Sequence, residues 1–107
     1  MKKEIIAKLT KSFEESAHIE QGVEFWMARD IQELLEYDKW SNFLNVIEKA
    51  KSACQNSSHS IADHFADVGK MVSIGSGSTR EISDIMLSRY ACYLIAQNGD
   101  PRKQIIV

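Results

Sequence analysis

The side chains best suited to hold a metal ion are two cysteines and two histidines. Cys54, His59 and His64 follow one another at intervals of five residues, and Cys92 would be the fourth ligand. Zinc favours thiolate and imidazole ligands in a tetrahedral array, but its usual sites contain closely spaced pairs such as C-x₂₋₄-C, and here only the two histidines have such a spacing. We therefore predict no metal site, and interpret the cysteines as core residues and the histidines as ordinary surface residues.

Carboxylates and hydroxyls provide no recognisable catalytic group either. Asp63 and Asp67 are four residues apart, which would place them on one helix face within reach of a hydrated Mg²⁺, but solvated carboxylates are far commoner there. Ser88 has no histidine close in sequence to act as its base, so helix capping explains it better. The chain has no G-x-S-x-G, S-x-x-K or Walker motif. We expect no enzymatic activity and no cofactor.

One predicted helix presents a polar face that suits nucleic acid. Its apolar residues recur at helical spacing between residues 41 and 53, and the opposite face carries asparagines and a lysine. Asparagine reads adenine through two hydrogen bonds, and lysine contacts phosphate. A basic residue before this helix and another near a predicted hairpin tip extend the set. The predicted contacts for nucleic acid or a protein partner are Lys39, Asn42, Asn45, Lys49, Ser52 and Arg80. The alternative is an exposed polar face without a partner.

Length, composition and charge limit the class of protein. The 107 residues are enough for one domain, and 44% hydrophobic with 26% charged residues is typical of a globular chain. Thirteen basic and fifteen acidic side chains give a net charge of −2, which disfavours a strongly basic, sequence-independent nucleic-acid binder. Residues 1–38 carry five basic and nine acidic side chains, and residues 39–107 carry eight and six, so the basic excess lies in the second part.

The sequence predicts a cytoplasmic protein that does not cross a membrane. No stretch approaches the ~18 apolar residues of a membrane span, and Glu4 and Lys8 interrupt the first apolar run. Two cysteines are too few for a disulfide framework, and two reduced core thiols are the simpler interpretation, although a single bridge between them stays open. The chain ends on the apolar run 105–107, from which we expect a segment truncated from a longer protein.

The apolar spacing predicts an α+β fold of several short helices with a small antiparallel sheet. We expect helices over residues 2–17, 27–35, 41–54, 60–68 and 89–97, a break over 18–22, strands over 23–27, 71–74 and 80–87, and a hairpin tip over 75–79. The predicted N-caps are Ser41, Ser60 and Ser88. The second and third helices form a helix-turn-helix-like unit beside the hairpin. We divide the chain into an N-terminal amphipathic helix and linker, residues 1–22, and a domain over residues 23–107.

Several strings of residues resemble the DNA-damage-inducible protein D family. The resemblance covers nearly the whole chain after residue 23, and its most specific strings are Leu87-Ser88-Arg89-Tyr90-Ala91-Cys92-Tyr93-Leu94 and Gln97-Asn98-Gly99-Asp100-Pro101. Further matches are Trp26-Met27-Ala28-Arg29, Ala50-Lys51-Ser52-Ala53-Cys54 and His59-Ser60-Ile61-Ala62-Asp63-His64-Phe65. The front half of this bacterial family is similar to the Bro-N and KilA-N-type domains of phages and large DNA viruses.

The resemblance implies a function that the residues alone do not. Family members look like non-enzymatic proteins of the bacterial DNA-damage (SOS) response that modulate the RecA recombinase on single-stranded DNA, and Bro-N relatives are described as DNA-binding modules. Two hypotheses follow. In the first, the domain engages a recombinase–DNA filament chiefly through protein contacts. In the second, it binds DNA directly as a module of the Bro-N type. The resemblance assigns no catalytic residue.

Overall fold

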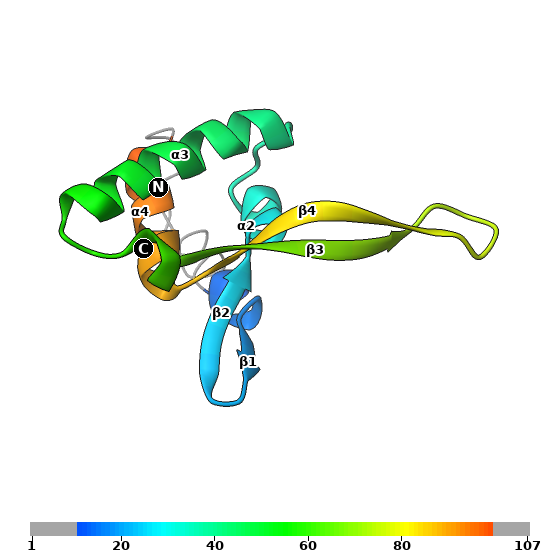
Figure 1. Ribbon diagram of the computed structural model, residues 1–107. Helices are drawn as coiled ribbons and strands as arrows, with labels where there is room; N and C mark the ends of the chain where they lie inside the picture. The colour runs from blue at the N-terminus through cyan, green and yellow to red at the C-terminus, as the bar shows by residue number, and fades with distance from the viewer. Residues whose placement is uncertain (1–10, 100–107) are drawn as a thin grey trace.

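The computed structural model describes residues 11–99, which adopt the predicted α+β fold (Figure 1). The elements in chain order are β1 (His18–Glu20), β2 (Val23–Met27), α2 (Ala28–Leu34), α3 (Trp40–Asn56), the 3₁₀ turn η1 (Ile61–Asp63), β3 (Phe65–Ser73), β4 (Thr79–Leu87) and α4 (Arg89–Asn98). The strands form one antiparallel sheet in the order β1-β2-β4-β3. Residues 11–15 are helical, and the rest of the predicted first helix before them lies outside the described residues, as does the apolar run 105–107.

The core forms where α3 and α4 pack together beside the start of the sheet. Apolar residues of α3 recur at the predicted helical spacing and are buried, namely Phe43, Val46, Ile47, Ala50 and Cys54. Trp26 of β2 is fully buried, stacks on Phe13 with ring centroids 4.5 Å apart, and donates its indole N–H to the Phe13 carbonyl at 2.8 Å. Because the ring is buried and its one donor is satisfied, Trp26 holds the helical segment over residues 11–15 against the sheet.

The prediction of a helix over residues 60–68 is wrong. Only η1 is helical there, and β3 begins at Phe65 and pairs with β4 from Phe65↔Leu87 to Ser73↔Thr79. The spacing of Ile61, Phe65 and Val68 fits a helix, but pairing with β4 satisfies the backbone of this segment over nine residues, and tertiary pairing overrides such a local preference. Asp63 and Asp67 therefore do not share a helix face.

The predicted ends of elements are partly correct. Ser88 caps α4, since its Oγ accepts the Ala91 N–H at 3.0 Å. The prediction that Ser41 caps α3 is wrong, because the helix begins at Trp40 after an N-cap at Lys39. Ser60 likewise makes no side-chain cap bond. The expected break at 18–22 is the short strand β1 and a tight turn whose residues, Gln21 and Gly22, have positive φ.

A two-stranded arm is the most prominent feature of the fold. Strand β2 pairs with β4 only at Trp26↔Leu87 and Met27↔Met86, so the remainder of β3 and β4 continues as a ribbon without a third strand. Figure 1 shows this arm projecting away from the helices, with the loop between β3 and β4 at its tip. The predicted hairpin tip is confirmed. No helix within residues 11–99 is long and apolar enough to cross a bilayer.

Candidate nucleic-acid interface

The polar face of α3 is exposed along its whole length. Asn42, Asn45, Lys49 and Ser52 are all exposed, on the side opposite the buried stripe. Lys39 at the N-cap and Arg80 near the tip of the arm are exposed too. All six predicted contact residues are therefore accessible to a partner.

Strand register divides the charged side chains of the arm between its two faces. Successive side chains of a strand point to opposite sides, and residues directly opposite each other on paired strands share a side. We name the two sides the basic face and the acidic face. The basic face consists of Val68, Lys70, Val72, Arg80 and Ile82, with Asp84 at its root. The acidic face consists of Asp67, Gly69, Met71, Ser73, Thr79, Glu81 and Ser83, with the buried Ile85 opposite Asp67 at its root.

The two faces differ in charge and in apolar exposure. Beyond Asp84, whose side chain is only 1% exposed, both charged residues of the basic face are cations, Lys70 and Arg80. The acidic face carries two exposed carboxylates, and Met71 on the same face is 60% exposed. The side chain of Glu81 lies over Gly69, where a Cβ would come within 2.5 Å of its Cδ. The arm therefore has sides suited to chemically different partners.

The start of α2 is fixed to the basic face at the root of the arm. Asp84 Oδ1 accepts the backbone N–H of Arg29 at 3.1 Å and that of Ile85 at 2.8 Å. Because the N-cap of α2, Met27, has no side chain that can cap the helix, this carboxylate from a distant strand serves as the cap. The Arg29 side chain donates Nε–H to the Ser83 carbonyl at 2.8 Å, and its guanidinium lies 4.1 Å from the Trp40 ring centroid.

These contacts decide which predicted residues lie near one another. Trp40 is the first residue of α3, so the beginning of that helix and Lys39 lie beside the root of the arm. A helix rises 1.5 Å per residue, so Ser52 lies roughly 18 Å farther along α3. Arg80 lies toward the other end of the arm, close to its tip. The polar face of α3 and the tip of the arm are therefore separate surfaces, linked through Arg29 and Trp40.

The six predicted contact residues leave out two basic residues of this region, Arg29 and Lys70. Lys70 lies in no predicted element, because the predicted helix over residues 60–68 ends before it and the next predicted strand begins at Met71. The alternation of Val68, Lys70 and Val72 was the available signal for a strand. For Arg29, no sequence pattern reveals its contact with a tryptophan eleven residues later.

The cysteines and histidines cluster only in part. His64 Nδ1 lies 2.7 Å from Ser88 Oγ, and the rings of His59 and His64 lie against Tyr90 with centroids 4.7 and 4.9 Å away. The structure thus brings a histidine to Ser88 that sequence proximity did not reveal. The Ser88 hydroxyl accepts the Ala91 N–H as a helix cap, and can donate to an unprotonated Nδ1.

The thiols pack in the core rather than at a ligand site. Cys54 Sγ lies 3.8 Å from the Ser60 carbonyl, and Cys54 and Cys92 are both buried and unpaired. Burial strongly raises the pKa of the Cys92 thiol, and burial also raises that of Cys54. No group of three or more potential metal ligands occurs among residues 11–99.

Arg89 is a cation already neutralised within the protein. Its Nη atoms donate to Glu14 at 2.7 and 2.9 Å, and Nε and one Nη donate to Glu24 at 3.2 and 2.8 Å. The hydrogen bonds to Arg89 lower the pKa of the Glu14 carboxyl. Arg89 therefore joins the N-terminal helical segment to β2 and contributes little to attraction of a polyanion.

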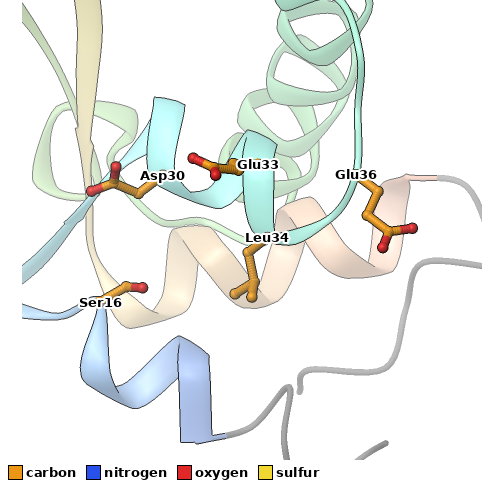
Figure 2. Close-up of a pocket in the computed structure, with 5 residues that line it drawn as sticks. All are labelled: Ser16, Asp30, Glu33, Leu34 and Glu36. Atoms are coloured by element: carbon orange, nitrogen blue, oxygen red, sulfur yellow. The ribbon is translucent and has the colours of Figure 1, made fainter.

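A hollow of about 410 Å³ beside α2 is acidic. It is lined by Ser16, Asp30, Glu33, Leu34 and Glu36. Figure 2 shows Asp30 and Glu33 close together on α2, with Glu36 farther along the chain. His18 Nε2 lies 3.7 Å from Asp30 Oδ2. Carboxylates repel phosphate, so this hollow does not belong to a nucleic-acid surface.

Comparison with known proteins gives two matches. The family described as "BRO family, N-terminal domain" matches residues 15–107. A curated protein of Escherichia coli (strain K12), DNA damage-inducible protein D, is 52% identical over 85 residues, which is 79% of this chain and 31% of the relative. The chain thus spans about a third of the length of that relative. No solved structure matches the chain.

Proposed function

Because the chain belongs to the family of BRO N-terminal domains, we propose that it is a non-enzymatic, cytoplasmic binding module of the bacterial DNA-damage response. Its target in this proposal is a nucleoprotein filament, a RecA-type recombinase assembled on single-stranded DNA. The name of the relative, DNA damage-inducible protein D, supports the link to DNA damage. Because the chain covers 31% of that relative, we assign it a binding role and not the activity of the whole relative.

The two-sided arm is the observation that carries this proposal. Its basic face, with Lys70 and Arg80, suits a sugar–phosphate backbone, which a positively charged surface can follow. Its acidic face, with Asp67, Glu81 and the exposed Met71, suits a protein surface with basic and apolar groups. A net charge of −2 gives the domain little attraction to phosphates alone. A filament offers both kinds of surface at once.

A co-sedimentation experiment tests the proposal. The chain is mixed with RecA, with oligothymidine, and with RecA assembled on oligothymidine, and the bound fraction is measured. We expect the filament to bind the chain more tightly than RecA or oligothymidine alone. Failure to bind the filament in excess of both components would reject the proposal.

Matched variants assign each face to its partner. Lys70→Gln with Arg80→Gln neutralises the basic face, and Asp67→Asn with Glu81→Gln neutralises the acidic face with the same number of substitutions. We expect both pairs to weaken filament binding, and only the first pair to weaken binding to bare oligothymidine. The acidic-face pair serves as the matched control for the DNA contact.

Direct binding to DNA is the second candidate function. The basic face is part of a two-stranded ribbon, and the major groove of B-DNA admits a ribbon of that width. The exposed Asn42 and Lys39 at the start of α3 add a base-reading and a phosphate-binding group near the root of the arm. Electrophoretic mobility shifts with duplex DNA across a salt series test it. Tight, salt-dependent binding by the chain without recombinase would favour this function over the first.

A further inference from the structure

We propose that Arg29, stacked on Trp40 at the root of the arm, binds a phosphate of the nucleic-acid backbone. The inference rests on the proposed function, because it requires that nucleic acid lies along the basic face of the arm. It adds a contact that neither the sequence nor the family match assigns. The argument uses the geometry of the guanidinium, the hydrogen-bonding atoms that remain unused, and the charges around it.

Two contacts hold the guanidinium in one position. Nε donates to the Ser83 carbonyl at 2.8 Å, and the guanidinium carbon lies 4.1 Å from the centroid of the Trp40 ring. An arginine side chain otherwise loses considerable rotamer freedom when it binds a ligand. Here the fold has already ordered it, since Ser83 belongs to β4 and Trp40 begins α3. The group is thus preorganised for an anion.

The atoms that recognise phosphate remain available. Among residues 11–99, neither Nη nitrogen of Arg29 has a hydrogen-bond or ion-pair partner, and the side chain is partly exposed. Arg89 provides the contrast, because its Nη nitrogens are committed to the carboxylates of Glu14 and Glu24. The planar fork of a guanidinium matches two phosphate oxygens. A cation held by an aromatic face and a carbonyl, without a carboxylate, is arranged to receive an external anion.

The surrounding charges favour an anion at this place. Asp84 lies at the root of the arm, where its Oδ1 accepts two backbone N–H groups and its Oδ2 has no partner among the described residues, but its side chain is buried and makes no ion pair with the Arg29 guanidinium within residues 11–99. Asp30, the next residue of α2, faces His18 and the acidic hollow. Asp38 neighbours Lys39 in the sequence, and both are exposed. Lys70 and Arg80 continue the positive charge outward along the basic face, so a backbone that follows the arm reaches Arg29 at its root.

The test measures the binding of fluorescein-labelled oligothymidine by fluorescence anisotropy in a salt series. Arg29→Gln removes the charge and should lower affinity about fivefold to tenfold at low salt. It should also reduce the slope of log affinity against log salt by about 0.7, the contribution of one phosphate contact on a single strand. Lys11→Gln is the control, because Lys11 is an exposed cation paired with Glu15 away from the arm. It should leave both quantities unchanged.

Arg29→Lys separates a stacked guanidinium from a mere positive charge. This variant keeps the charge, so its salt slope should match that of the wild type, but it loses the planar fork and should bind about threefold more weakly. Thermal denaturation checks that each variant is folded. If Arg29→Gln does not fold, the affinity of Arg29→Lys decides the question. A lysine variant that binds as tightly as the wild type would overturn the assignment.

The outcomes also separate this inference from the proposed function. If Lys70→Gln with Arg80→Gln weakens binding and Arg29→Gln does not, the arm binds nucleic acid and the inference about Arg29 is wrong. If Arg29→Gln weakens binding to the recombinase filament but not to oligothymidine, Arg29 contacts an acidic group of the protein, and the inference is again wrong. If the wild type does not bind oligothymidine at any salt concentration, both the DNA contact of the arm and the phosphate site are rejected.

Discussion

Replacing Asp84 should loosen the junction between α2 and the arm. Its Oδ1 accepts two backbone N–H groups, from Arg29 and Ile85, and Asp84→Ala leaves both donors without that partner. A buried donor left unsatisfied costs about 1–3 kcal/mol. Removing a buried carboxylate whose Oδ2 has no hydrogen-bond partner among the described residues offsets part of this cost. We expect a net loss of about 2–3 kcal/mol in the free energy of unfolding.

Asp84→Asn provides the matched comparison. The amide keeps an oxygen that can accept both N–H groups, while the charge attracted to the N-terminus of α2 is lost, so we expect a loss of about 1 kcal/mol or less. Urea denaturation gives the free energies, and hydrogen exchange gives the protection of the Arg29 and Ile85 amides. We expect these two amides to lose protection in the alanine variant before the core of α3 does. An alanine variant as stable as the wild type, or an asparagine variant as unstable as alanine, would refute the reasoning.

Three further predictions concern helix α4 and its neighbours. Ser88→Ala removes the N-cap of α4 and should lower the free energy of unfolding by about 1 kcal/mol in thermal denaturation, whereas Ser88→Thr should lose less; equal losses would argue against capping. Burial raises the pKa of the Cys92 thiol, so a disulfide reagent should react with it only as fast as the protein unfolds, and prompt reaction in the native state would contradict that burial. The pKa of Glu14 is lowered, so its ionised carboxylate stabilises the fold at pH values above the ordinary carboxyl pKa, and this stabilisation should disappear as the pH falls through the lowered pKa. In urea melts across that pH range, Glu14→Gln should flatten the dependence of the free energy of unfolding on pH. An unchanged pH profile would count against the ion pair with Arg89.

Local sequence determined those elements whose residues interact within a turn or two. The apolar stripe of α3 and the cap at Ser88 are both such cases, since each depends on residues three or four positions apart. The strings around Ser88 also identified the family that the comparisons show. The six predicted contact residues are exposed, as their polar character implied, although their role as contacts stays a prediction.

Contacts between distant segments decided the rest. The segment after residue 60 has a spacing compatible with a helix, and only the presence of β4 opposite it makes it a strand. Once that pairing is set, its register sorts Lys70 and Arg80 to one side of the arm and Glu81 to the other, because opposite residues of paired strands share a face. No pattern within either strand alone contains this division of charge.

The sequence by itself thus determined the fold class, the buried stripe of α3 and the family, because helical periodicity and family motifs depend on residues that are close together in the sequence. Only the tertiary structure decided that Arg29 lies on Trp40 beside Ser83, and that the arm has two chemically different faces. The physical reason is that side chains far apart in sequence meet only after strands choose their partners and register, and that choice is made by the backbone hydrogen bonds and packing of the whole domain.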